Sequence, residues 1–90
     1  MRFELGEVLA SGAALSALTR EQIIIALARH EAGDWGELDP EDKQRNEQAL
    51  RVGDRLISSY TFSNRERGVG VWVTTEPDRS YMTILLREDY

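Results

Sequence analysis

Few residues of this chain could do acid–base or phosphate chemistry. His30 is its one histidine, and the chain has no cysteine. A histidine can act as a general base near neutral pH because its pKa lies close to 7. An enzymatic interpretation would combine this base with cationic and hydrogen-bonding groups that bind RNA and stabilise a phosphorane. The candidate catalytic residues in that interpretation are His30, Asn46, Arg55, Ser58 and Arg79.

His30 and Asn46 also have structural interpretations. His30 follows Ile23 and Leu27 at the i, i+4, i+7 spacing, which places it on the inward face of a helix. It lies near the carboxyl end of that helix, where its charged form would interact favourably with the helix dipole. Asn46 falls on the inward stripe of a second helix, and an inward asparagine indicates a polar network between helix and sheet. We therefore expect both side chains to be partly buried and within reach of the sheet, as a structural network or as an active site.

No motif of known chemistry surrounds these residues. The hydroxyls near Ser58 and Thr74 lack a nucleophile elbow, a phosphate-binding glycine loop and a pair of carboxylates at catalytic spacing. A single histidine without cysteine argues against a zinc site. The sequence therefore predicts no metal, no cofactor and, in the interpretation we favour, no catalytic residue.

Length and charge narrow the classes of function. Ninety residues make one domain, 1–90, and such a short chain needs every large apolar residue in its core. Sixteen acidic and eleven basic residues give a net charge of −5, which opposes nucleic-acid binding. A local basic patch is still possible in this acidic chain, because four arginines fall within one stretch: Arg51, Arg55, Arg65 and Arg67. The amino terminus does not resemble a signal peptide and no segment is long and apolar enough to cross a bilayer, so we expect a cytoplasmic protein with no membrane contact.

The amino-terminal half carries helix signals. Residues 3–10 suit a short strand, and a short helix follows Ser11. Thr19 and Gln22 have the spacing of a capping box, which predicts a helix from Arg20 to about Glu31 that ends at Gly33. In the turn at 33–36, Trp35 is expected to pack inward. Asp39 and Pro40 begin a second long helix, expected to run to about Val52 and to stop at Gly53.

From Arg55 onward the hydrophobic period becomes that of strands. We expect three antiparallel strands at 55–62, 69–75 and 80–86, with 63–68 as the first linker and 76–79 as a hairpin loop. Counting from that loop pairs Thr75 with Ser80, Val73 with Met82 and Val71 with Ile84. The predicted fold is α+β: two to three helices on one face of a small antiparallel sheet, a three-stranded meander with a further amino-terminal strand as an option.

The other face of this sheet is the candidate binding surface. It carries Trp72, Thr74, Tyr81 and Thr83, an amphipathic set that is unusual where nothing touches it. Either the amino-terminal strand or a long loop covers these residues, or they bind a protein partner. Two acids of the second long helix, Glu41 and Glu47, are further candidate contacts, although an acidic helix is more often a solvated face.

A set of short motifs follows in a fixed order along the chain. They are Ala28-Arg29-His30, Gly33-Asp34-Trp35-Gly36, Asn46, Ser58-Ser59-Tyr60, residues 72–76, Asp78-Arg79-Ser80 and residues 83–90. Their order resembles a family of small, poorly characterised proteins encoded on plasmids, phages and integrated elements. The resemblance covers about residues 5–90. This chain differs from the pattern at Pro77 and Arg87 and in a longer linker at 64–70.

Together with the absence of a catalytic motif and the acidic net charge, this resemblance leads us to expect an accessory protein of a mobile element that acts by binding another protein, such as a host defence or regulatory factor. The element order is also similar to ribonuclease toxins of the RelE and barnase type, which is an analogy of fold and not of function. A small nuclease or toxin-type enzyme is therefore the alternative hypothesis, and it conflicts with the acidic net charge.

Overall fold

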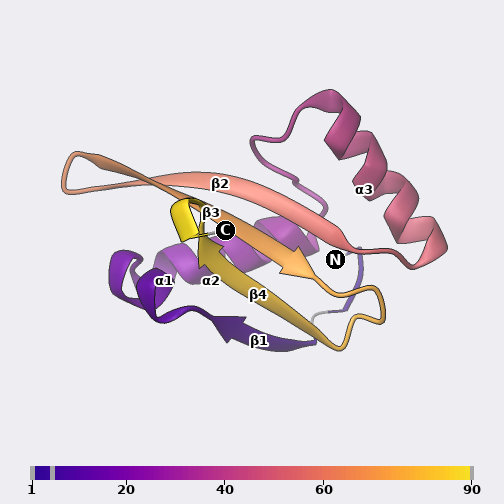
Figure 1. Ribbon diagram of the computed structural model, residues 1–90, viewed down its shortest axis with the longest axis horizontal. Helices are drawn as coiled ribbons and strands as arrows, with labels where there is room; N and C mark the ends of the chain where they lie inside the picture. Colours follow the sequence, from indigo (N-terminus) through magenta and orange to yellow (C-terminus); the bar gives the residue numbers. More distant parts are fainter. Residues whose placement is uncertain (1, 5, 90) are drawn as a thin grey trace.

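The computed structural model describes residues 2–4 and 6–89 (Figure 1). Each of its three α-helices begins after a side chain that caps the helix, Ser11, Thr19 or Asp39. Helix α1 spans Gly12–Ala17, α2 spans Arg20–Glu31 and α3 spans Pro40–Val52. The predicted capping box at the start of α2 is present in both directions, between Thr19 and Gln22. Gly33 and Gly53 both have positive φ, as expected where a helix ends in the left-handed region. The bounds of both long helices are those that the sequence predicts.

Four strands form one mixed sheet. They are β1 (Glu7–Ala10), β2 (Leu56–Asn64), β3 (Arg67–Thr75) and β4 (Tyr81–Leu86), in the order β1-β4-β3-β2, and a short 3₁₀ helix, η1 (Arg87–Asp89), follows. The expected antiparallel meander is β2-β3-β4, and the fold is α+β. The optional amino-terminal strand is present, but it runs parallel to β4. It starts only at Glu7, while Phe3 packs on the core and Leu5 lies outside the described residues.

The first hairpin differs from the predicted linker. Strands β2 and β3 continue to Asn64 and Arg67, so the connection is a two-residue turn at Arg65 and Glu66. Both turn residues have positive φ, 51° and 64°, which suits the twist of a tight hairpin although neither is glycine. Asn64 anchors this end of the hairpin, because its side-chain amide donates to the Ala17 carbonyl oxygen. The predicted linker at 63–68 is therefore wrong, because only Arg65 and Glu66 form the turn and the residues on either side of them belong to β2 and β3.

The second hairpin has a different register from the predicted one. Thr75 pairs with Met82 and Val73 with Ile84, because the four-residue loop lies at 77–80 and not at 76–79. The Asp78 carboxylate accepts bonds from the backbone N–H and the hydroxyl of Ser80, which holds Ser80 in the loop. The pairing shifts by two residues, so each side chain keeps the face that the sequence assigned to it.

Helices α1 and α2 cover one face of the sheet, and α3 lies along the outer edge of β2 (Figure 1). A larger core cluster joins α1 and α2 to the sheet, and a smaller one contains Trp35. Trp35 packs inward as predicted, with 4% of its surface exposed. The expectation that every large apolar residue is buried is wrong. Ile24 and Ile25 of α2 are 55% and 47% exposed, because they point away from the sheet.

Candidate functional site

His30 is enclosed between α2 and the sheet. Its Nδ1 atom lies 2.5 Å from the Ser58 hydroxyl on β2, and its Nε2 atom lies 2.7 Å from the Thr75 hydroxyl on β3. Phe3 and Trp35 meet the imidazole edge to face, at centroid distances of 5.3 and 5.8 Å. A hydroxyl can donate or accept, so both ring nitrogens have partners while the imidazole is neutral.

Burial keeps His30 neutral. Loss of water around the ring, and secondly the positive charge of Arg79, lower the pKa of His30 from 6.5 to about 4. The suggested role for a charged His30 at the helix carboxyl end is therefore wrong. Its side chain has no exposed surface, and neither have those of Ser58 and Thr75. In this conformation the group is a hydrogen-bonded element of the core and no substrate can touch it.

Asn46 is buried as predicted, but it belongs to a different contact. Its side-chain amide donates to the Ile57 carbonyl oxygen at 2.6 Å, and its oxygen accepts from the Ile57 N–H at 3.1 Å. Strand β2 is at the edge of the sheet, so these two bonds satisfy backbone groups that no further strand pairs. The loop before α3 does the same at Ser59, which bonds the backbone of Trp35 and Glu37. Asn46 thus makes a polar contact between helix and sheet, but His30 and Asn46 do not share one network, and the bonds at Ile57 and Ser59 cover part of the β2 edge.

The candidate arginines do not form a cluster around His30. Arg79 donates to three backbone carbonyl oxygens, those of Ala49, Asp54 and Glu76, and so ties the β3-β4 loop to the end of α3. Arg55 pairs with Glu76 at 3.8 Å. Of the five residues in the enzymatic interpretation, His30 and Ser58 are the pair joined by a hydrogen bond, while Arg79 acts on His30 only through its charge.

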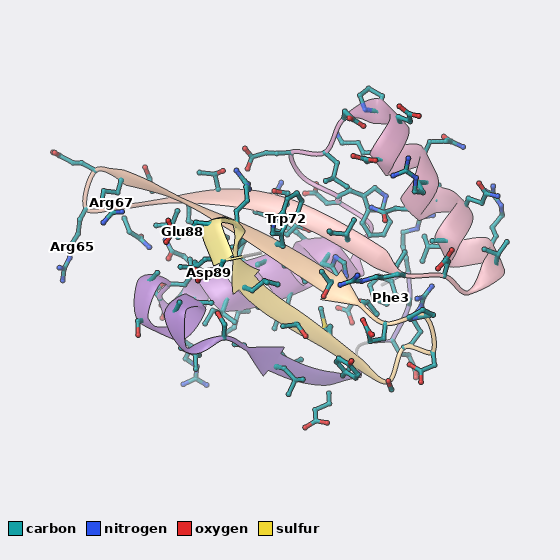
Figure 2. All side chains as sticks on the ribbon, viewed as in Figure 1. Phe3, Arg65, Arg67, Trp72, Glu88 and Asp89 are labelled. Atoms are coloured by element: carbon teal, nitrogen blue, oxygen red, sulfur yellow. The ribbon has the colours of Figure 1, made fainter. Side chains whose placement is uncertain are left out.

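The suggested arginine patch is divided between two ends of the molecule. Arg65 and Arg67 lie at the tip of the β2-β3 hairpin, far from Phe3 at the other end of the sheet (Figure 2). Arg51 and Arg55 precede β2, a strand of nine residues that spans roughly 30 Å. Four arginines close together in the sequence therefore present no single basic surface.

The second face of the sheet has a different composition. Trp72, Tyr81, Thr83 and Leu85 point to this face, and all are partly exposed. Within residues 2–4 and 6–89, neither β1 nor a long loop covers them, because β1 extends the sheet beside β4. Thr74 is also on this face but is only 4% exposed, so it supports its neighbours and offers little surface. We call Trp72, Tyr81, Thr83 and Leu85 the open face.

Arg87 crosses the open face and is the residue that sequence reasoning missed. Its Nη2 donates to the Ser59 hydroxyl and the Tyr60 carbonyl oxygen, and its guanidinium lies 5.7 Å from the Trp72 ring centroid. Gly70 makes room for it, since a Cβ there would stand 2.8 Å from the guanidinium carbon. A glycine in the middle of a strand is the signal in the sequence for such a close approach.

The two acidic candidates have different surroundings. Glu47 accepts a bidentate ion pair from Arg2, at 2.7 Å for each bond, and a 2.8 Å bond from the Trp35 indole N–H. These donors lower the pKa of Glu47 to about 2, with Arg2 contributing most. Glu47 thus connects the amino terminus, the 33–36 turn and α3, while Glu41 is exposed on the first turn of α3.

Two further features concern metals and membranes. Over residues 2–4 and 6–89, no group of three or more histidine, cysteine, aspartate or glutamate side chains is arranged to hold a metal ion. Within the same residues, none of the helices has the length and apolarity to span a bilayer.

Comparison of the chain with protein families, curated proteins and solved structures finds no match.

Proposed function

We propose that this protein acts by binding another protein through its open face. The observation that carries the proposal is the position of Trp72, an aromatic ring beside the Arg87 guanidinium on the sheet face opposite α1 and α2. Tryptophan and arginine are the residue types that contribute most binding energy at protein interfaces. Trp72 is held in β3 between β2 and β4, and Arg87 is held by its bonds to Ser59 and Tyr60, so binding would order few further side chains.

The open face fits a protein segment that combines an apolar side chain with a carboxylate. The apolar side chain would lie against Trp72 and Leu85, and the carboxylate would bind the Arg87 guanidinium. Arg87 has capacity for this, because its pair with Glu37 at 3.6 Å is long and its side chain is 39% exposed. Tyr81, which is 38% exposed, would lie at the rim of the contact.

A protein partner is favoured over a nucleic acid by the distribution of charge. The net charge of −5 repels a phosphate backbone, and the arginines are divided between two ends of the sheet. The nuclease alternative also lacks an accessible general base, because His30 is sealed in the core. The resemblance to proteins of plasmids, phages and integrated elements extends the proposal to a host defence or regulatory protein as the partner.

Affinity capture from a host lysate tests the proposal when three proteins are compared: wild type, Trp72→Ala and Val52→Ala. Val52 is 66% exposed at the end of α3, so its variant is the matched surface control. We expect wild type and Val52→Ala to capture the same partner. With that partner purified, Trp72→Ala should weaken binding at least about tenfold. Equal affinity for Trp72→Ala would exclude the open face as the binding surface.

Incubation with total RNA tests the alternative. We expect no cleavage by the wild-type protein near physiological salt, since neither a basic surface nor an exposed base is present. Cleavage by wild type that is lost in a folded His30→Gln variant would favour the nuclease instead.

A further inference from the structure

The outward side of α2 is apolar at its centre. Ile24 and Ile25 are 55% and 47% exposed, and Ala28, one turn further on, is exposed as well. Isoleucine is a weaker helix former than the polar residues that usually occupy such positions, so helix formation does not explain either residue. Adjacent exposed apolar side chains on one helix face are typical of a surface that is buried in an assembly.

The charges around this apolar centre are arranged symmetrically. Arg20 and Glu31 flank the Ile24 side of α2, one at each end of the helix. Glu21 and Arg29 flank the Ile25 side, again with opposite charges at opposite ends. The midpoint of each pair lies within one residue of Ile25. Each pair therefore has its acid and its base at equal distances from the same point.

We propose that two copies of this chain associate through α2, packed antiparallel about a two-fold axis next to Ile25. An antiparallel two-fold keeps the same flank of both helices together and reverses their direction. Arg20 of each copy then meets Glu31 of the other, and Glu21 of each copy approaches Arg29 of the other. The isoleucines at the centre pack against each other, and the two helix dipoles oppose.

Charge complementarity selects a second copy as the occupant. Antiparallel α2 helices put opposite charges face to face at both ends without any change of sequence, whereas a different partner would have to supply that pattern itself. Arg20 and Glu31 are available for this contact, since among the described residues no ion pair within the chain includes either one. Arg29 already pairs with Asp34 at 2.6 Å, so its contribution is secondary.

The position of α2 in the fold permits this association. Helix α2 lies on one face of the sheet beside α1, with Ile24 and Ile25 exposed on its outward side, and α3 lies at the β2 edge of the sheet (Figure 1). The open face is on the opposite side of the sheet from α2. A dimer formed through α2 would therefore present two open faces pointing away from each other, and it would make the proposed partner binding bivalent without depending on it.

Sedimentation equilibrium over a range of concentrations tests the dimer. We expect wild type to form a dimer at high concentration, and Ile25→Glu to raise the dissociation constant by about 100-fold or more, because two charged side chains would be buried at the axis. Val52→Glu, on α3, is the control and should dimerise as wild type does. Circular dichroism confirms that both variants fold. A wild-type chain that stays monomeric at all concentrations overturns the proposal.

A charge exchange tests the antiparallel orientation. Arg20→Glu should weaken the dimer, and the double variant Arg20→Glu with Glu31→Arg should restore it, because each new glutamate would meet a new arginine of the other copy. Both substitutions place charges that favour the helix dipole of α2, so loss of the dimer cannot come from loss of the helix. If the double variant is as weak as the single one, the proposed orientation is wrong.

Disulfide formation locates the axis. The chain has no cysteine, so Ile25→Cys introduces a single thiol that would lie beside its counterpart in the other copy. Under mild oxidation we expect Ile25→Cys to cross-link much faster than Val52→Cys. Equal rates for the two variants would mean random collision and would exclude the α2 interface.

Discussion

The two faces of the sheet come from alternate residues of the same strands, yet the key polar side chain is buried on one face and partly exposed on the other. On the face under α2, His30 is enclosed by the hydroxyls of Ser58 and Thr75. On the open face, Arg87 is partly exposed and lies beside Trp72. The residue best suited to catalysis is therefore the one that no substrate can contact, whereas an arginine without a predicted role lies where a partner could bind it.

Burial decides whether a potentially reactive group can act on a substrate. A histidine with two hydroxyl partners looks like catalytic machinery when only its contacts are considered. With no exposed surface and a pKa of about 4, the same group is a neutral part of the core. The proposed binding surface is accordingly the open face and not the surroundings of His30.

The largest expected effect contrasts the two tryptophans. Trp35→Ala should destabilise the protein by about 3 to 5 kcal/mol, because it leaves a cavity beside His30 and removes the indole bond to Glu47. Urea denaturation measures the change in the free energy of unfolding. A Trp35→Ala variant as stable as wild type would mean that the 33–36 turn does not contribute to the core, contrary to the 4% exposure of Trp35.

The second-largest expected effect is that of acidification, which should lower the free energy of unfolding through His30. The folded pKa of His30, about 4, lies below its ordinary value of 6.5, so the unfolded chain binds the proton more readily. The contribution of neutral His30 to stability is thus complete above pH 6.5 and is lost as the pH falls toward 4. The loss reaches about 3 kcal/mol at 1.36 kcal/mol per pKa unit. Urea denaturation at a series of pH values measures it.

His30→Gln is the control for this titration. The variant should lose the pH dependence between 6.5 and 4, because glutamine does not titrate. The dependence at lower pH should remain, since Glu47 has a pKa of about 2 and loses its contribution as the pH falls from 4.5 toward that value. An unchanged profile between pH 6.5 and 4 in His30→Gln would assign the effect to other groups.

On the open face, Arg87→Ala should have a smaller effect. It removes the donor to the Ser59 hydroxyl, which is 2% exposed, and the bond to the Tyr60 carbonyl oxygen. We expect the free energy of unfolding to fall by about 1 to 2 kcal/mol. The fluorescence of Trp72 should also change, because the guanidinium beside its ring is removed. Arg67→Ala at the hairpin tip is the control, and it should change neither quantity.

The smallest expected effect is that of Trp72→Ala on stability. This ring is partly exposed, so its removal should cost about 1 kcal/mol or less in the free energy of unfolding, while it weakens partner binding. Denaturation of Trp72→Ala beside Trp35→Ala makes the comparison direct. Equal losses of stability from the two substitutions would mean that Trp72 serves the core and not a binding surface.

Local signals in the sequence determined the helices and the faces of the strands. The capping box at Thr19 and Gln22, the Asp39-Pro40 start and the stop at Gly53 act over a few residues, so the bounds of α2 and α3 could be predicted. The assignment of side chains to faces held even where the register was wrong, because the pairing shifted by two residues and the side-chain period of a strand is also two.

Contacts between distant segments decided the rest. The parallel pairing of β1 with β4, the extension of β2 and β3 to the Arg65-Glu66 turn and the path of Arg87 over Gly70 all join residues that no local pattern relates. The inward position of His30 could be read from its helical spacing, but its two hydroxyl partners lie 28 and 45 residues away in the chain. Only the tertiary structure could show that they enclose it, because burial depends on what the whole chain packs around a residue.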